Sequence, residues 1–207
     1  MQLFDNKEYL ENLLSFGVGN KACSEAEKIN KTFLSGADIA STSSHVLQNL
    51  SGCNEQTAEF IRLVSAVSSR RITDKFKSGR KYSREEIERY VCALLFHLTV
   101  ESVYIILFDK NGKLLSAELI TEGTVNSSAF LPRKMVDIAL RKKAASVILA
   151  HNHPSGNPLP SDNDIAVTLL AESVLRDASV KLEAHYITVG FNICDCLKEI
   201  KKTHPAY

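Results

Sequence analysis

The residues best suited to chemistry lie between Ala150 and Asp164, in the segment AHNHPSGNPLPSDND. His151 and His153 follow an apolar run, and side chains two residues apart in an extended chain point to the same side. Asp164 enters the first turn of the next expected helix, where the positive end of the helix favours a carboxylate. Two histidines and one carboxylate are a typical ligand set for catalytic zinc, with water in the fourth position. The segment therefore predicts a Zn²⁺ site formed by His151, His153 and Asp164.

Ser161 precedes Asp164 by three residues, and this spacing has two interpretations. Zinc lowers the pKa of its water toward about 7 and polarises a carbonyl, so a nearby glutamate can accept the water's proton. A hydroxyl such as that of Ser161 can then donate to the developing oxyanion. The same spacing is also that of a capping box, in which Ser161 only begins the helix. The sequence leaves both roles of Ser161 open.

The second half of the chain predicts the strands and helices that would position these residues. Ser83 and Glu86 have capping-box spacing, and residues 109–112 read Asp-Lys-Asn-Gly, a strong turn signal between two apolar segments. Expected strands cover 103–108, 114–120, 146–150 and 186–189, and expected helices begin at Ser83 and Pro132 and cover 165–174. This alternation predicts an α/β domain, a β-sheet with helices packed on its faces.

The first 70 residues predict helices only. Tyr9 and Leu10, followed by Leu13 and Leu14, recur at helical spacing, and residues 55–67 repeat the pattern. The stretch from 68 to 81 is polar and basic without a sustained apolar period, which indicates a linker. We therefore expect a small all-α domain at 1–70, a linker at 71–82 and a second domain at 83–207.

The composition is that of an ordinary globular protein, with 44% hydrophobic and 24% charged residues among 207. A net charge of +1 is unlike that of a strongly basic nucleic-acid binder. The five cysteines are scattered and odd in number, which favours a reducing compartment. The beginning of the chain does not resemble a signal peptide, and no apolar run approaches the roughly 20 residues that span a bilayer. We expect a cytoplasmic protein without a membrane partner.

The spacing H-x-H, seven residues, S, two residues, D places His151, His153, Ser161 and Asp164 in a pattern that resembles the JAMM motif of JAB/MPN metalloproteases. The string HNHPSGNPLPS and the preceding EGTVNSSAFLPRKMVDIALRKKAASVILA are similar to the RadC branch of that family, and the resemblance covers most of residues 85–190. It implies a central β-sheet flanked by helices, similar to cytidine deaminases. It also implies a zinc-dependent hydrolase that cleaves amide bonds of a peptide or protein substrate, including isopeptides.

The resemblance implies a catalytic glutamate between the first helix of the second domain and the strand after it. Glu101 holds that position, and Glu122, which follows the second expected strand, is the rival. The chain departs from the RadC pattern before the last expected strand, where an Asp-His pair is usual and Ala184-His185 stands instead. This departure puts any supporting role of the missing aspartate in doubt.

The N-terminal helices resemble the region that precedes the RadC catalytic domain and often contains a helix-hairpin-helix. The turn would be Leu50–Asn54, whose backbone amides can face a DNA phosphate. Asn54 replaces the second glycine but tolerates the left-handed conformation. Glu55 and Glu59, opposed only by Arg62, make a poor phosphate site. A structural helical domain is therefore favoured over DNA binding. The alternative functions are a DNA-associated repair or recombination factor and a non-catalytic interaction module.

Overall fold

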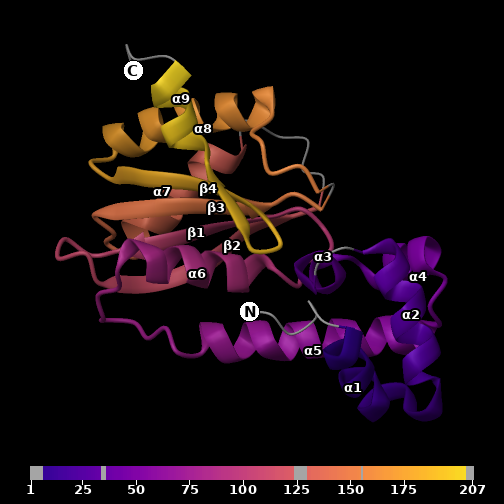
Figure 1. Cartoon of the computed structure of the whole chain (residues 1–207). Helices are drawn as coiled ribbons and strands as arrows, with labels where there is room; N and C mark the ends of the chain where they lie inside the picture. Colours follow the sequence, from indigo (N-terminus) through magenta and orange to yellow (C-terminus); the bar gives the residue numbers. More distant parts are fainter. Residues whose placement is uncertain (1–6, 34–35, 124–129, 155, 204–207) are drawn as a thin grey trace. The chain divides into compact units, whose positions relative to one another are not determined.

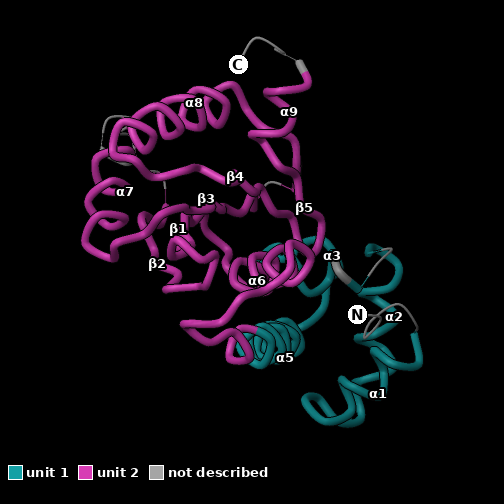
Figure 2. The backbone as a smooth tube through the Cα atoms, turned by 90° about the vertical axis from the view of Figure 1, so that its left-hand side faces the viewer, with its two compact units in different colours: residues 1–72 teal, residues 73–207 magenta. Residues whose placement is uncertain are grey.

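The computed structural model describes residues 7–33, 36–123, 130–154 and 156–203 (Figure 1). The chain divides into two compact units, Met1–Ile72 and Thr73–Tyr207, which Figure 2 colours separately. Each unit is described by itself. No helix in the described parts of the chain is long and apolar enough to cross a membrane.

The first unit is helical. Its elements are α1 (Lys7–Val18), the 3₁₀ helix η1 (Gly19–Lys21), α2 (Ala22–Thr32), α3 (Gly36–Ser41), α4 (Ser44–Ser51) and α5 (Glu55–Thr73). α2 packs against both α1 and α4. Leucine and isoleucine side chains that are fully buried form the core of this unit: Leu10, Leu14, Ile29, Leu47 and Ile61. The helices that the apolar spacing predicted are present as α1 and α5. Leu10 and Leu14 of α1 are buried, whereas Tyr9 is exposed.

α5 is longer than the sequence indicated, and the first three residues of the expected linker at 71–82 are helical. Ser65 and Ser69 lie on its buried side, so the apolar spacing fades while the helix continues. The Ser65 hydroxyl donates to the Ile61 carbonyl at 2.9 Å, which satisfies it within the helix. The rest of the expected linker is ordered on the second unit. The Leu114 carbonyl accepts from the N–H of Gly79, a residue of this segment, at 2.7 Å.

The second unit is a mixed α/β domain with a central sheet. Its elements are α6 (Arg84–Leu95), β1 (Ser102–Phe108), β2 (Leu114–Glu122), α7 (Phe130–Arg141), β3 (Ser146–Asn152), α8 (Asp162–Asp177), β4 (Lys181–Val189), β5 (Asn192–Asp195) and α9 (Cys196–Thr203). The strand order is β2-β1-β3-β4-β5. β3 and β4 are parallel, and the other neighbouring strands are antiparallel. The predicted sheet with flanking helices is confirmed, and the likeness to cytidine deaminases stays a prediction.

The two faces of the sheet carry separate cores. Val147 and Leu149 of β3 pack in the cluster that α7 and α8 cover, whereas Ile148 and Ala150 pack in the cluster with α6. Figure 2 shows α6 on one side of the sheet and α8 on the other. This alternation fixes the direction of each following residue of β3. An odd-numbered side chain at its end faces α8, and an even-numbered one faces α6.

The C-terminal region differs from the expectation that residues 186–189 form the last strand, which was wrong. β5 pairs antiparallel with β4 after a turn at Gly190, whose φ is 59°. α9 then buries Cys196, Leu197 and Ile200. A strand of four residues is too short to show a clear alternation of apolar and polar side chains, which is why the sequence did not reveal it.

Candidate metal centre

Three side chains from β3, the loop after it and α8 converge on one point. His151 is buried near the end of β3, His153 follows the strand, and Asp164 is the third residue of α8. The two histidine Nε2 atoms lie 2.9 Å apart. Asp164 Oδ1 lies 3.2 Å from Nε2 of His151, and Oδ2 lies 3.4 Å from Nε2 of His153. The structure thus brings together the three side chains that the sequence predicted as ligands, and this group could hold a metal ion.

The ring of His153 is oriented by a backbone carbonyl. Its Nδ1 lies 2.7 Å from the carbonyl oxygen of Asn157. A carbonyl only accepts hydrogen bonds, so Nδ1 carries the proton and the neutral ring leaves Nε2 bare. The loop therefore turns the bare nitrogen of His153 toward the point where the three side chains meet.

The ring of His151 is oriented by a chain of buried hydrogen bonds. Burial lowers the pKa of His185 to about 3, so this ring is neutral. Thr168 donates its hydroxyl proton to the Asp164 carbonyl at 2.5 Å and must accept from Nδ1 of His185 at 2.6 Å. Nε2 of His185 is then an acceptor, and Nδ1 of His151 donates to it at 2.9 Å. His151 is left with a bare Nε2, like His153.

The donor set fits a small cation. Two bare imidazole nitrogens and a carboxylate are all acceptors, so atoms this close repel unless a proton or a metal ion lies between them. Ligand atoms in a tetrahedral zinc site lie about 3.3 Å from one another, as follows from zinc–ligand distances of about 2.0–2.2 Å. The observed separations of 2.9, 3.2 and 3.4 Å bracket that value.

Asp164 is held by the start of its own helix. Burial alone would raise the pKa of this carboxyl, but the adjacent His151 ring and the hydrogen bonds from Ser161 outweigh burial and hold the pKa well below its usual range. The Ser161 N–H and hydroxyl donate to Oδ2 at 2.8 and 2.6 Å, and the Asp164 N–H donates to Oγ of Ser161 at 3.2 Å. The capping-box interpretation of Ser161 is therefore confirmed. Its role as an oxyanion donor stays a prediction.

The two glutamates that the sequence left as rivals lie at the same end of the paired strands β1 and β2. Glu101 directly precedes β1, is exposed, and its carbonyl accepts from the Gly123 N–H at 2.8 Å. Glu122 ends β2 and is the partner of Ser102 in the pairing of the two strands. Neither carboxylate belongs to the group of possible metal ligands found among the described residues.

His185 and Thr168 were not assigned a role from the sequence, although they orient a proposed ligand. They lie 34 and 17 residues from His151 along the chain, so no local spacing could have linked them. The Ala184 departure is explained by the alternation of β4. Ala184 packs in the cluster with α6, on the face opposite to His185, so an aspartate there would not reach the ligands.

The hairpin between α4 and α5 is closed by its own hydrogen bonds. Gly52 ends α4 in the left-handed conformation, and its N–H donates to the Gln48 carbonyl at 2.8 Å. The Cys53 N–H donates to Ser51 Oγ at 3.2 Å, and the Asn54 N–H donates to Oε2 of Glu25 at 2.6 Å. The amides that would face a phosphate already have acceptors within the chain.

Asn54 does not take the left-handed conformation that the sequence allowed. Among the described residues other than glycine, only Lys143 and Ser179 have positive φ. Asn54 caps α5 instead, because its Oδ1 accepts from the Thr57 N–H at 2.8 Å. The turn therefore differs from the phosphate-binding hairpin that it resembles in sequence.

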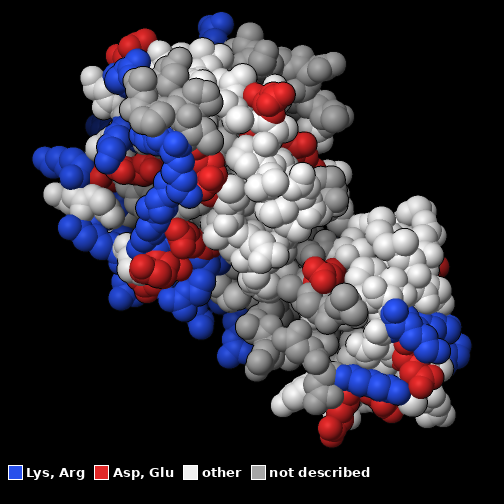
Figure 3. Space-filling view, turned by 45° about the horizontal axis from the view of Figure 1, so that its top comes forward, with Lys and Arg blue, Asp and Glu red and all other residues white. Residues whose placement is uncertain are grey.

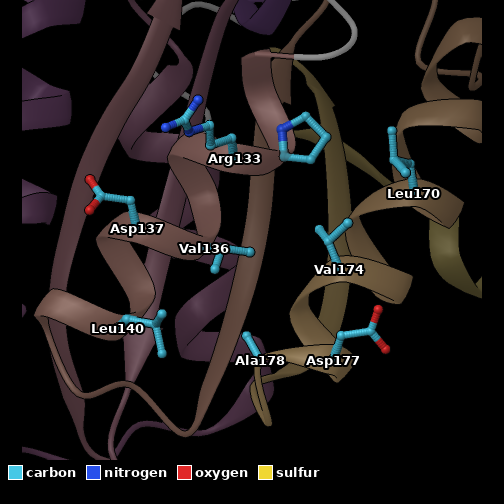
Figure 4. A pocket seen from close by; sticks show the side chains of 9 residues that line it. Arg133, Val136, Asp137, Leu140, Leu170, Val174, Asp177 and Ala178 are labelled. Atoms are coloured by element: carbon cyan, nitrogen blue, oxygen red, sulfur yellow. The ribbon is translucent and has the colours of Figure 1, made fainter.

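A groove with a volume of about 740 Å³ lies between α7 and α8 (Figure 4). Leu140 and Leu170 are exposed at its rim, and Val136 and Val174 lie between them. The groove contains no histidine or cysteine. Its lining combines apolar side chains with three charged ones, Arg133, Asp137 and Asp177, and offers no group of possible metal ligands like that of the metal centre.

Comparisons with known proteins agree with the geometry. Residues 82–198 match the family model described as the RadC-like JAB domain. UPF0758 proteins of Bordetella avium and Finegoldia magna are 37% and 35% identical to this chain over 127 residues, which are 60% and 61% of it and 56% of each relative. A UPF0758 protein of Photobacterium profundum is 28% identical over 198 residues, 86% of this chain and 88% of the relative. The chain therefore spans little more than half the length of the first two relatives.

Proposed function

Because the chain belongs to the RadC-like JAB domain family, we propose that it is a zinc-dependent hydrolase that cleaves an amide bond in a peptide or protein substrate. The observation that carries the proposal is the convergence of three acceptor groups, with the proton of each imidazole committed elsewhere. In a cluster of surface histidines without a ligand, nothing would require both rings to turn an unprotonated Nε2 toward the same point. The donor set of two nitrogens and one carboxylate matches that of catalytic zinc sites.

Zinc held by His151, His153 and Asp164 would lower the pKa of a bound water toward about 7 and polarise the scissile carbonyl. In this proposal the Glu101 carboxylate accepts the proton of the attacking water and passes it to the leaving nitrogen. The Ser161 hydroxyl donates to the developing oxyanion, while its N–H keeps Asp164 in place.

The pairing of the strands supports Glu101 over Glu122 as the base. Val103 pairs with His151 and packs in the cluster beneath α8, so these two side chains share a face. Glu101 lies two residues before Val103, and continued alternation directs it to the same face. Glu122 raises the pKa of Tyr104, after the larger effect of burial, and Tyr104 packs in the cluster with α6. The carboxylate of Glu122 therefore lies toward the opposite face.

The alternative, a DNA-associated repair factor, has less support. Besides the closed hairpin, cationic side chains are interspersed with acidic ones on the face seen in Figure 3. Lys142 pairs with Glu118 at 2.8 Å, and Lys181 pairs with Glu183 at 2.7 Å. Paired charges attract phosphate less than free ones, because the acidic partner repels it.

Metal content tests the proposed function most directly. Elemental mass spectrometry on protein purified without a chelating tag should find about one zinc per wild-type chain. His151→Ala and Asp164→Ala should each remove it. Wild-type protein that takes up no metal even after zinc is added would overturn the proposal. A positive result justifies a search for cleavage among peptides and isopeptides, with Glu101→Gln as the inactive, zinc-loaded control.

A further inference from the structure

Asn152 lies between the two proposed metal ligands, but its side chain serves a different part of the protein. It is buried at the end of β3, and because successive side chains of a strand alternate, it faces away from the metal centre. Its Oδ1 accepts from the Ser102 N–H at 2.8 Å. Its Nδ2 donates to the carbonyls of Leu98 and Val100, each at 3.0 Å. The side-chain amide thus binds three backbone groups between Leu98 and Ser102, the first residue of β1.

These hydrogen bonds surround one residue, Glu101. The carbonyl of Val100 and the N–H of Ser102, its two chain neighbours, are both bound to Asn152. The carbonyl of Glu101 accepts from the Gly123 N–H at 2.8 Å, which ties the same point to the end of β2. The backbone on both sides of Glu101 is therefore fixed, although its carboxylate belongs to an exposed residue.

The chemistry of the contact requires an amide side chain. The site presents two carbonyl acceptors and one N–H donor, so it needs two donors and one acceptor on the same group. Asparagine supplies both kinds of atom from a short side chain, whereas an aspartate offers acceptors only and a serine has a single proton to donate. A side chain chosen merely to fill space in the core would not match this pattern.

We propose that Asn152 is a positioning residue that fixes Glu101 beside the metal ligands. The inference rests on the proposed function, in which Glu101 accepts a proton. One strand end then sets both halves of the site. His151 and His153 would hold the metal on one face, and the Asn152 side chain, on the other face, binds the backbone of the segment that directs Glu101 toward the metal. A misplacement of about 1 Å can cost roughly 100-fold in rate, so such a contact matters for a base on an exposed segment.

The first test measures whether Asn152 holds the segment, and it requires neither metal nor substrate. Asn152→Asp keeps the size and the acceptor but turns a carboxylate oxygen toward two carbonyls. Ser102→Ala is the matched control, because it removes a hydrogen bond of 3.1 Å to the same Val100 carbonyl and leaves the three Asn152 bonds intact. Amide hydrogen exchange of the zinc-free full chain should accelerate by about tenfold or more over 97–102 in Asn152→Asp only.

Unchanged exchange over 97–102 in Asn152→Asp would overturn the proposal, as would equal acceleration throughout the sheet. Asn152→Ser, which keeps one donor without adding a charge, gives the same comparison should Asn152→Asp fail to fold. Because the metal is absent from this experiment, its outcome is independent of the proposed zinc chemistry.

The second test links the segment to Glu101 in the full chain loaded with Co²⁺, whose visible spectrum reports the groups around the metal. Glu101→Gln should move the pH midpoint of the spectrum by roughly half a unit or more, because a carboxylate next to the metal is lost. Asn152→Ser, which adds no charge, should bind the same amount of Co²⁺ and move the midpoint in the same direction. Added to Glu101→Gln, it should cause no further shift.

Independent, additive shifts would show that Asn152 does not act through Glu101. Loss of Co²⁺ from Asn152→Ser alone would assign the residue to ligand placement instead. If the wild-type chain binds no Co²⁺, the proposed function fails, and the exchange experiment still decides whether Asn152 holds the segment.

Discussion

The metal centre and the α4–α5 hairpin each place a carboxylate at the start of a helix, but they leave its oxygens in opposite states. Asp164 accepts from the N–H of Ser161, the residue that caps α8. Its oxygens also face the bare nitrogens of His151 and His153. Glu25 accepts from the Asn54 N–H before α5 and pairs with Lys28 at 2.7 Å. The first cluster has surplus acceptors, whereas the second has matched donors and acceptors.

The difference teaches which observation separates a functional polar cluster from a structural one. Both clusters contain buried charge at a helix start, so neither residue type nor burial distinguishes them. The balance of donors and acceptors does. A buried set with surplus acceptors is costly unless a cation binds, whereas a set with matched partners is stable alone. Four predictions test this contrast, beginning with the largest effect.

Asp164→Ala should weaken zinc binding by at least about 100-fold, beyond what the loss of an outer partner costs. The physical reason is the removal of the only negative charge from the acceptor cluster. Competition with a chromogenic chelator measures the affinity. The matched control is Asp162→Ala, an exposed carboxylate in the same first turn, which should bind zinc like the wild type. Equal affinities in the two variants would erase the distinction between the clusters.

His185→Leu should weaken zinc binding by about 10–100-fold, the usual effect of removing a group that orients a ligand. Leucine offers no acceptor, so the proton of His151 has no fixed place and its Nε2 is no longer held bare. The same chelator competition gives the number. Thr188→Val removes a longer contact, of 3.4 Å, to the backbone carbonyl of His151 and should change affinity little. A wild-type affinity in His185→Leu would mean that His151 keeps its orientation without the buried chain of hydrogen bonds.

Glu25→Gln should destabilise the first unit by about 1–3 kcal/mol at pH 7, because hydrogen bonds to a charged group are lost. Burial raises the pKa of Glu25, but bonds from Lys28 and the Asn54 N–H outweigh it and lower the pKa. The stabilisation by the ionised Glu25 carboxylate is therefore fully present above the unfolded-state pKa of about 4.3 and is lost as pH falls through the folded-state pKa. Denaturant unfolding measures the free energy of unfolding of both proteins. The difference between Glu25→Gln and the wild type should be smaller at pH 3 than at pH 7.

The control for this prediction is Glu27→Gln on the same helix, which loses only an exposed pair with Lys7. Exposed pairs contribute little to stability, so this variant should unfold like the wild type at both pH values. A gap for Glu25→Gln that stays constant or widens in acid would show that its carboxylate is not the stabilising form.

The sequence predicted those parts of the fold and the site that depend on local spacing. Both capping boxes, at Ser83 and at Ser161, formed as expected, because their hydrogen bonds join residues three apart. The side on which His151 and His153 point followed from the period of an extended chain. Such features need only the conformation of one segment.

The remainder depends on contacts between distant segments. The partner of His151 is supplied by β4, and the roles of Glu101 and Glu122 depend on the register of β1 with its two neighbours. A shift of one residue in a register exchanges the faces of every side chain, and spacing along one strand does not determine it. The closure of the hairpin by Glu25, 29 residues away, was unforeseen for the same reason.

The smallest effect is expected where the sequence resembles a DNA-binding turn most closely. Asn54→Gly restores the second glycine, yet the N–H of residue 54 should stay bound to Glu25 Oε2, because that contact of 2.6 Å involves the backbone. A phosphate would have to displace a buried carboxylate and would be repelled by it. Affinity for a labelled four-way DNA junction should therefore stay within about twofold of the wild type. One new phosphate contact would steepen the plot of log affinity against log salt by about 0.9. A slope that steepens by that amount in Asn54→Gly would show that the hairpin can open to DNA, and that a matched set of donors and acceptors does not by itself mark a structural cluster.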